Sequence, residues 1–241
     1  AGKAVWLEKP LALTEEELAG IVALLEDPAT PPVRAMVGFN RRYAPLTRWV
    51  ASRLKREGPV MMQIRVNAGP LPPNSWILDP VEGGGRIRGE VCHFVDLLHA
   101  FAASAPVRVF AEAPTSPPDT LPQEVSVTIR FADGSIGTIL YAACGDPEGG
   151  KEYIEIMADG AIAVIDDFRY ASISRHGKKE QERLRHQDKG QSAQIDAFFQ
   201  AIRENRALSL TESIRSTLVT LKIEESLRTG APILLGDPEG G

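Results

Sequence analysis

Three polar residues in one short stretch have the types and the spacing for acid–base chemistry. Glu90, His93 and Asp96 follow one another at intervals of three residues, shortly after the glycine run 83–85. On a helix that begins where the glycines end, these residues project from neighbouring points of one face. An imidazole held between two carboxylates exchanges a proton near neutral pH, as a general acid or base must.

The same spacing has a purely structural interpretation. A helix with an acid near its start and a histidine among apolar residues also suits a capped helix with a half-buried, hydrogen-bonded imidazole. Rows of charge at helical spacing are usually solvated faces. The spacing alone leaves both interpretations open. The helix itself is predicted by apolar residues that recur with helical period, namely Ile87, Val91, Phe94, Leu97, Leu98 and Phe101.

The composition is that of a globular protein, with 241 residues, 43% hydrophobic and 24% charged. A net charge of −5 without a basic run does not favour nucleic acid or an anionic membrane surface as a partner. No apolar run approaches the roughly 20 residues that span a bilayer. The two cysteines, Cys92 and Cys144, form no C-x-x-C pair or metal-ligand cluster. We therefore expect buried thiols, no metal and a reducing, cytoplasmic location.

Patterns before the glycine run predict a strand–helix–strand unit and a further helix and strand. A capping box at Thr14–Glu17 marks the start of the first helix. The expected elements are a strand at 4–7, a helix from Thr14 to just before Asp27, a strand at 33–39, a helix at 45–57, a strand at 59–67 and a proline-rich loop at 71–81.

Residues after 104 predict an antiparallel sheet. Apolar and polar residues alternate in several short segments joined by turn sequences, which is typical of strands with one buried face. We expect an α+β fold, an open-faced, mostly antiparallel sheet with helices on one face. The expected elements are strands at 107–112, 124–131, 135–143, 153–158 and 161–165, a mobile polar excursion at 176–189, and helices at 192–204 and, after a threonine cap, at 211–229.

Four motifs in this order closely resemble those of the family of glucose-fructose oxidoreductase, inositol dehydrogenase and MocA. They are Glu8-Lys9-Pro10 after a strand, the sequence Gly38-Phe39-Asn40-Arg41-Arg42-Tyr43, the glycine run that leads to His93 and Asp96, and the final helix from Thr211 to Gly230. Each motif is weak alone, but their order makes the resemblance specific over nearly the whole chain.

The resemblance implies a two-domain enzyme, with an N-terminal Rossmann domain for NAD(P) and a C-terminal open-faced sheet that binds substrate and dimerises. It implies that Lys9 touches both nicotinamide and substrate, and that His93 acts on the substrate hydroxyl. These roles are chemically reasonable. Oxidation of a secondary alcohol needs a base for the hydroxyl proton, a hydride acceptor and a cation near the developing oxyanion.

The chain departs from the family pattern in two ways. Where the family has an Asp four residues before the histidine, this chain has Gly89, and we expect Glu90 to replace it. No G-x-G-x-x-G fingerprint for a dinucleotide is present. We therefore expect residues 1–40 to be the last strand–helix–strand of a Rossmann-like domain, 41–235 the substrate-binding and dimerisation domain, and 236–241 a tail. We expect this chain alone to be inactive.

The resulting functional prediction is the substrate-binding and catalytic half of an NAD- or NADP-dependent dehydrogenase for a sugar or cyclitol. We expect a homo-oligomer, formed through the sheet and also through the strands of residues 1–40, whose edges are exposed without the rest of a Rossmann sheet. Two alternatives stay open, a binding or dimerisation module without chemistry and an NAD-dependent glycoside-cleaving enzyme. The predicted site residues are Lys9, His93 and Glu90 for catalysis, Glu8, Lys9 and Pro10 for the cofactor, and Arg42, Tyr43, Asn67, Trp76 and Arg86 for the substrate.

Overall fold

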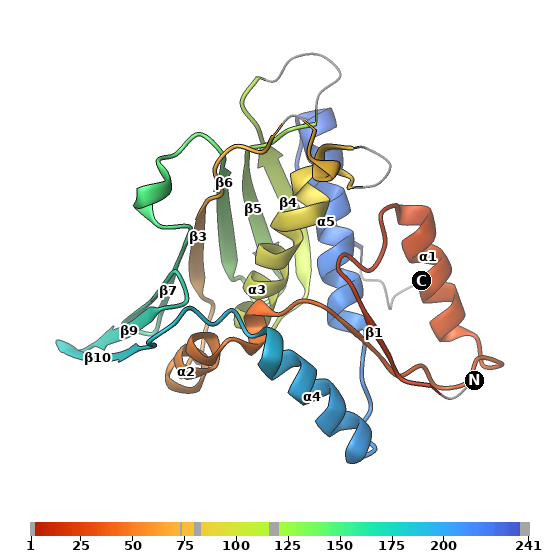
Figure 1. Ribbon diagram of the computed structural model, residues 1–241, viewed down its shortest axis with the longest axis horizontal. Coiled ribbons are helices and arrows are strands. Elements are labelled where there is room, and N and C mark those ends of the chain that lie inside the picture. The colour runs from red at the N-terminus through yellow and green to blue at the C-terminus, as the bar shows by residue number, and fades with distance from the viewer. Residues whose placement is uncertain (1–2, 73, 80–82, 116–120, 237–241) are drawn as a thin grey trace.

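One large sheet, with helices packed on one of its faces, organises the protein (Figure 1). The computed structural model describes residues 3–72, 74–79, 83–115 and 121–236. The predicted loop 71–81 and tail 236–241 therefore lie partly outside the described residues. The expected α+β architecture with an open-faced, mostly antiparallel sheet is confirmed.

The sheet has nine strands in the order β10-β9-β8-β7-β3-β6-β5-β4-β11. Neighbouring strands are antiparallel except β3 and β6, which run parallel. Because β3 lies in the middle of this strand order, it joins the two halves of the sheet into one continuous unit. The strands are β3 (Met61–Asn67), β4 (Pro106–Glu112), β5 (Val125–Phe131), β6 (Ile136–Ala142), β7 (Glu152–Ala158), β8 (Ala161–Asp166), β9 (Tyr170–Arg175), β10 (Lys178–Arg183) and β11 (Ile233–Leu234).

Three helices cover one face of the sheet, while the other face is open. α2 (Pro45–Arg53), α3 (Cys92–Ala102) and α5 (Thr211–Thr229) contribute to one apolar core with the inward side chains of the strands. β5 alternates buried and exposed residues along its whole length, as expected for a strand with one covered face. α3 comes especially close to β6, because a Cβ atom on Gly137 would lie 2.7 Å from Leu98 Cδ1.

The first elements form a small parallel unit beside α5 (Figure 1). β1 (Val5–Leu7) pairs in parallel with β2 (Ala35–Val37), and α1 (Glu15–Glu26) connects them. The predicted capping box at Thr14 is confirmed, since Glu17 N donates to Thr14 Oγ1 at 3.1 Å. A second apolar core joins this unit to α5 and to Cys92. The expected domain boundaries stay a prediction.

Three details of the sequence interpretation are wrong. The polar segment 176–189 is not a mobile excursion, because most of it forms the turn after β9 and the edge strand β10, which is exposed at every residue. Such a strand has no buried face and so lacks the alternation that reveals strands. The last helix is capped by Leu210 without a side-chain hydrogen bond. Cys144 is exposed, whereas Cys92 is buried as expected.

α4 (Gln191–Arg203) contacts the 3₁₀ turn Arg41–Tyr43 and lies to the right of α2 in the view of Figure 1. It follows a loop that leads away from β10 and past the start of α2. Within the described residues, no helix is long and apolar enough to cross a membrane.

Candidate active site

Lys9 and His93, which are distant in sequence, lie close together in the structure. Lys9 lies two residues after the end of β1, and its Nζ donates a hydrogen bond to the carbonyl oxygen of Gly89. Gly89 belongs to the π-helical turn Ile87–Val91, which leads into α3 and so to His93. π-helical turns often occur at functional sites. The site is thus formed where the small parallel unit contacts the start of α3.

His93 is half-buried, and its ring lies edge-on to Phe39 with centroids 6.1 Å apart. Its Nδ1 atom is buried and has no hydrogen-bond partner among the described residues. Burial, together with the positive charges of Arg41, Lys9 and Lys189, holds the pKa of His93 well below its ordinary value of 6.5. The imidazole is therefore neutral at pH 7 and is able to accept a proton.

The buried carboxylate of Glu152 pairs with two of these cations, Arg41 and Lys189. Glu152, at the start of β7, is fully buried, and its two oxygens each accept a hydrogen bond of 2.9 Å from Arg41. Lys189 Nζ donates a hydrogen bond of 2.6 Å to Glu152 Oε1, the oxygen that also accepts from Arg41 Nη2. Burial alone would raise the pKa of Glu152, but these hydrogen bonds and charges outweigh it and hold the pKa below its ordinary value. Glu152 is therefore ionised and fixes both cations beside His93.

The backbone before α4 positions Lys189. The carbonyl oxygen of Lys189 accepts a hydrogen bond of 2.8 Å from Asn40 Nδ2. Gly190 follows with φ +89, and a Cβ atom there would lie 2.4 Å from Ala44 N and 2.5 Å from Asn40 O. Only glycine fits so close to this backbone. The loop is thus held tightly against the 3₁₀ turn Arg41–Tyr43, which carries the other cation.

The expected row of Glu90, His93 and Asp96 is wrong. Asp96 is buried and accepts two hydrogen bonds from Arg42, at 2.8 and 2.6 Å. Arg42 also pairs with Glu212 of α5, so its charge is engaged within the protein. His93 has cations rather than carboxylates as its charged neighbours. The prediction failed because the helix is π-helical up to Val91, and because spacing along one helix does not show which residues other elements bring to it.

Glu90 lies in a second charged group close to the first. Its carboxylate is 3.9 Å from Arg86 Nε and 3.9 Å from Lys151 Nζ. Burial and the nearby Glu90 raise the pKa of Tyr141, whose hydroxyl also accepts a hydrogen bond of 3.2 Å from Arg86. No hydrogen bond between Glu90 and His93 occurs among the described residues. A catalytic role for Glu90 stays a prediction.

The remaining predicted residues differ in how accessible they are. Arg86 is buried and also donates to Gly69 O at 2.7 Å, which is typical of a structural arginine. Asn67 contacts the 145–149 loop, and Tyr43 is half-buried under Arg48. Trp76 is 63% exposed, so its ring is free to contact a ligand. The substrate roles of these residues and of Arg42 stay predictions.

The cofactor residues of the Glu-Lys-Pro motif lie at the end of β1. Glu8 is exposed, whereas Lys9 and Pro10 are half-buried. Of the three, Lys9 is the one that contacts the His93 segment through a hydrogen bond. No group of three or more His, Cys, Asp or Glu in the described part of the chain is placed to hold a metal ion.

Sequence analysis missed three charged residues of this site, Arg41, Glu152 and Lys189. Glu152 gave a usable signal, because it is in phase with the buried residues Ile154 and Ile156 of the same strand. A charged residue in phase with a buried face indicates a buried ion pair, since an isolated charge there would be costly. Lys189 gave no such signal, because it lies in a polar segment.

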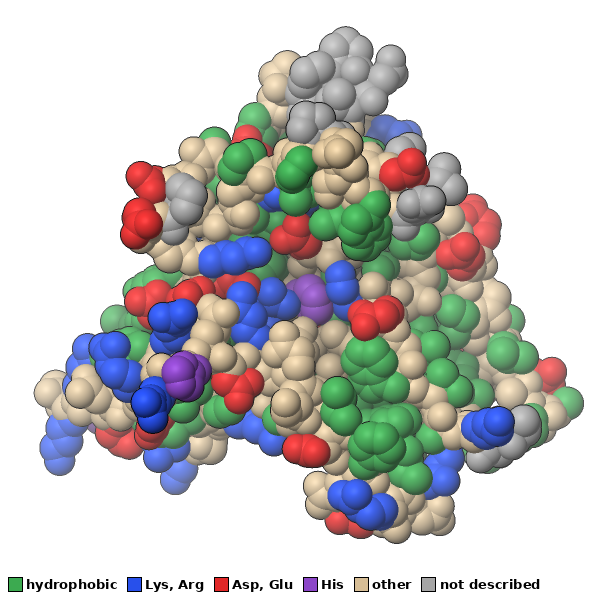
Figure 2. All heavy atoms as spheres, viewed as in Figure 1, with side chains coloured by type: hydrophobic (Ala, Val, Ile, Leu, Met, Phe, Trp, Pro, Cys, Tyr) green, Lys and Arg blue, Asp and Glu red, His purple; other side chains and the backbone are tan. Residues whose placement is uncertain are grey.

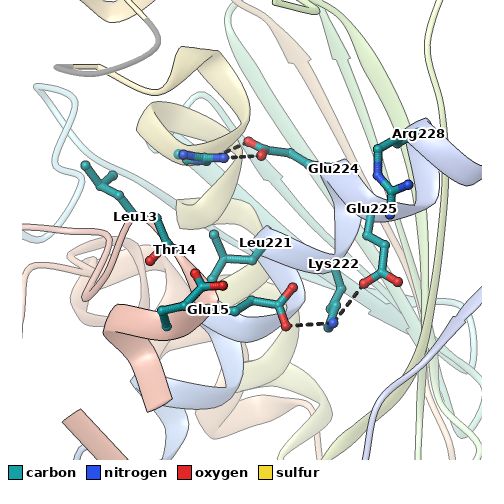
Figure 3. A pocket seen from close by; sticks show the side chains of 10 residues that line it. Leu13, Thr14, Glu15, Leu221, Lys222, Glu224, Glu225 and Arg228 are labelled. Carbon is teal, nitrogen blue, oxygen red and sulfur yellow. Dashed lines mark hydrogen bonds and ion pairs between the residues drawn. The ribbon is translucent and has the colours of Figure 1, made fainter. Parts of the chain in front are cut away.

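A cavity of about 570 Å³ lies away from this site, between α1 and α5 (Figure 3). Lys222 reaches between Glu15 and Glu225 in its wall, at 2.7 and 2.8 Å. Glu224 pairs with Arg88 nearby, at 2.8 Å. Because these charges are matched within the protein, we do not assign the catalytic chemistry to this cavity.

A second histidine, His99, makes stability depend on pH. It is buried on α3 with Nδ1 3.2 Å from Ser216 Oγ. Burial, against the charge of Glu212, lowers the pKa of His99 to about 4. Below about pH 6.5 the unfolded chain therefore binds a proton that the folded chain does not. We expect the free energy of unfolding to fall by up to about 3 kcal/mol from this residue as the pH drops from 6.5 to 4.

Urea unfolding of the native protein and of His99→Gln at several pH values between 7 and 4 measures this effect. Other titrating groups act in both proteins, so the difference between the two curves isolates His99. We expect the variant to lose less stability than the native protein as the pH falls. Parallel curves would show that His99 is protonated to the same extent in the folded and unfolded states.

Part of the chain, including residues of this site, matches a known protein family. Residues 58–164 match the family model of the GFO/IDH/MocA C-terminal domain. This segment extends from just before β3 into β8 and includes His93 and Glu152. The chain is thus similar to this domain over these residues, and its resemblance to the family is confirmed.

Known proteins of similar sequence and structure agree with this family. Inositol 2-dehydrogenase of Rhizobium meliloti (strain 1021) is 32% identical over 116 residues, which are 47% of this chain and 33% of that protein. The match thus spans about one third of the relative's length.

Two solved structures share the fold at 20% identity, each over 98% of this chain and 74% of the other. They are a myo-inositol dehydrogenase from Corynebacterium glutamicum ATCC 13032, with a TM-score of 0.74, and levoglucosan dehydrogenase in complex with NADH and L-sorbose, with a TM-score of 0.77.

Proposed function

We propose that this chain is the substrate-binding and catalytic half of an NAD(P)-dependent oxidoreductase that acts on a secondary hydroxyl of a sugar or cyclitol. The observation that carries the proposal is that Lys9 hydrogen-bonds the turn that leads into His93, which places a cation near a half-buried, neutral imidazole. The relatives named above, an inositol 2-dehydrogenase and a levoglucosan dehydrogenase with bound NADH, support this choice of reaction. A cytoplasmic location is part of the same proposal.

The geometry suits alcohol oxidation. A neutral His93 takes the proton of the substrate hydroxyl, and Lys9 stabilises the negative charge that develops on the oxygen. When bound, the nicotinamide supplies the acceptor for the hydride that leaves the same carbon. Both electrons of the C–H bond thus leave as hydride, while the proton stays on the imidazole. The imidazole of His93 is half-buried, so part of its ring reaches the surface, where a substrate hydroxyl is able to contact it.

The chain supplies residues for the nicotinamide end of a cofactor. Lys9, with Glu8 and Pro10 beside it, is the proposed contact. The sequence holds no G-x-G-x-x-G, whose backbone would bind the pyrophosphate. We therefore infer that this chain alone does not oxidise the substrate, and that the main dinucleotide site requires residues outside these 241.

Substrate binding is measurable without turnover. We expect titration with myo-inositol or D-glucose to shift the NMR signals of the His93 ring, because a bound hydroxyl must contact the imidazole. Lys9→Met should weaken this binding about tenfold, since one charge-assisted hydrogen bond is lost. Lys178→Met, on the exposed strand β10, removes the same charge away from the site and serves as the control. Ring signals that neither these polyols nor their acidic derivatives shift would contradict the proposal.

We also propose that two copies associate through the open face of the sheet. Met61, Met157 and Ile162 lie side by side across β3, β7 and β8, and are 55%, 45% and 45% exposed. An apolar row in the middle of a sheet is typical of a surface that another chain covers. We expect Met157→Lys to convert a dimer into a monomer in analytical ultracentrifugation. The matched change Thr128→Lys, on the same face of β5, should have a smaller effect. A native protein that is monomeric at all concentrations would contradict this proposal.

A further inference from the structure

Positive charge around His93 exceeds the negative charge that faces it. Lys9 hydrogen-bonds Gly89 in the turn before His93, and Arg41 lies over the ring of Phe94, the residue after His93. Lys189 shares Glu152 with Arg41, and Glu152 is the one carboxylate that pairs with any of the three cations among the described residues. Figure 2 shows Lys and Arg side chains gathered on both sides of a histidine in the middle of the face in view. A site with three cations and one buried anion retains a charge of about +2 at neutral pH.

Other carboxylates nearby do not cancel this charge, because cations of their own accompany them. Asp96 accepts hydrogen bonds from both Nε and Nη2 of Arg42. Glu90 lies between Arg86 and Lys151, at 3.9 Å from each. Neither acid hydrogen-bonds a cation of the His93 cluster in the part of the chain that the structure describes.

The three cations retain hydrogen-bond donors for a ligand. An ammonium group has three donors and a guanidinium five. Lys9 uses one on Gly89 O, and Lys189 uses one on Glu152. Arg41 reaches Glu152 through Nε and Nη2, and it lies over the Phe94 ring at 4.7 Å. Their side chains are only partly buried, with 11% exposed for Arg41 and 17% for Lys189.

Fixing cations together in this way is costly unless something pairs with them. Like charges that share one carboxylate oxygen repel each other, and partial burial weakens their solvation. Gly190 and Asn40 nevertheless hold the backbone so that Lys189 stays beside Arg41. Such an arrangement is typical of a site that binds an anion.

We propose that Arg41 and Lys189 form an anion subsite beside Lys9 and His93, and that the polyol substrate carries a carboxylate or a phosphate group. This inference rests on the proposed function and narrows its substrate class to acidic sugars or cyclitols. The anionic group contacts Arg41 and Lys189, while the reacting hydroxyl lies between Lys9 and His93. Glu152 is a positioning residue, since it acts through the two cations that it holds.

Calorimetric titration of the chain with three closely matched sugars tests this subsite. D-Glucuronate and D-glucose 6-phosphate carry the two candidate anions, and D-glucose is the neutral counterpart. At low salt we expect the preferred acidic sugar to bind at least tenfold more tightly than D-glucose, and the preference to shrink as salt screens the charges. The ratio between the two acids shows whether the group is a carboxylate or a phosphate.

Variants of Lys189 separate a charged subsite from a structural role. Lys189→Gln should remove most of the preference for the acidic sugar, while Lys189→Arg should keep it. Lys178→Gln, with the same loss of charge on exposed β10, should leave the preference unchanged. Melting curves of all three variants check that the fold is intact.

The possible outcomes distinguish the two proposals. Equal affinities for acidic and neutral sugars, or a preference that survives Lys189→Gln, would overturn the anion subsite and leave the proposed function in place. Failure of all three sugars to bind would overturn the assignment of this site to a sugar substrate, and the subsite with it.

Discussion

Replacement of His93 by alanine is expected to lower kcat by about 10²- to 10⁴-fold, which is the usual contribution of a positioned general base. The imidazole is neutral at pH 7 and half-buried beside a cation, so water cannot take its place with the same orientation. The measurement requires a form of the enzyme that includes the dinucleotide-binding residues, with NADH formation followed by absorbance. Binding of D-glucose should change far less than kcat, because the proton is transferred only in the reaction.

The pH profile and a matched variant show whether His93 is the base. A protonated imidazole cannot accept the hydroxyl proton, so kcat/KM falls as the pH drops through the pKa of His93. Burial and the cations hold that pKa well below 6.5, and the acid limb should therefore lie below pH 6.5. His176→Asn, at an exposed turn with φ +50, changes a histidine without touching the site. Equal activity of His93→Ala and His176→Asn would show that His93 is not the base.

The sequence was sufficient to predict the elements whose local signals are strong. The capping box at Thr14 and the alternation in β5 come from contacts within one element or one hairpin. Lys9 and His93 were indicated in another way, by the family resemblance of their motifs, and the structure brings Lys9 to the turn that leads into His93. The capping box and the alternation, by contrast, depend on the sequence around them. Such signals are local, so they survive without any knowledge of how the elements pack.

The electrostatics of the site could not be predicted in this way. Arg41, Glu152 and Lys189 come from three elements that are far apart in sequence, and only the sheet and the loop before α4 bring them together. The sign of the shift in the pKa of His93 depends on these distant cations. The neighbours on the helix, Glu90 and Asp96, suggested the opposite environment. A histidine's own helix is therefore a poor guide to its protonation.

Replacement of Glu152 by glutamine is expected to lower the free energy of unfolding by about 3 kcal/mol, the usual loss when one member of a buried ion pair is removed. The amide has nearly the same shape as the carboxylate, so the packing around this residue of β7 is retained. Arg41 and Lys189 would then repel each other without the carboxylate that both contact. Urea unfolding at pH 7 measures the change, because Glu152 is ionised there in the native protein.

Glu180→Gln provides the control, since it removes one carboxylate from an ion pair on the surface. Glu180 is 3.2 Å from Arg53, and the two side chains are 68% and 40% exposed. Water and salt screen such a pair, so its loss should cost less than about 1 kcal/mol. Equal effects of the two substitutions would mean that Glu152 holds Arg41 and Lys189 no more firmly than a surface carboxylate would. The cations would then not be fixed beside His93, and the site would lack the preorganised charge on which the substrate assignment depends.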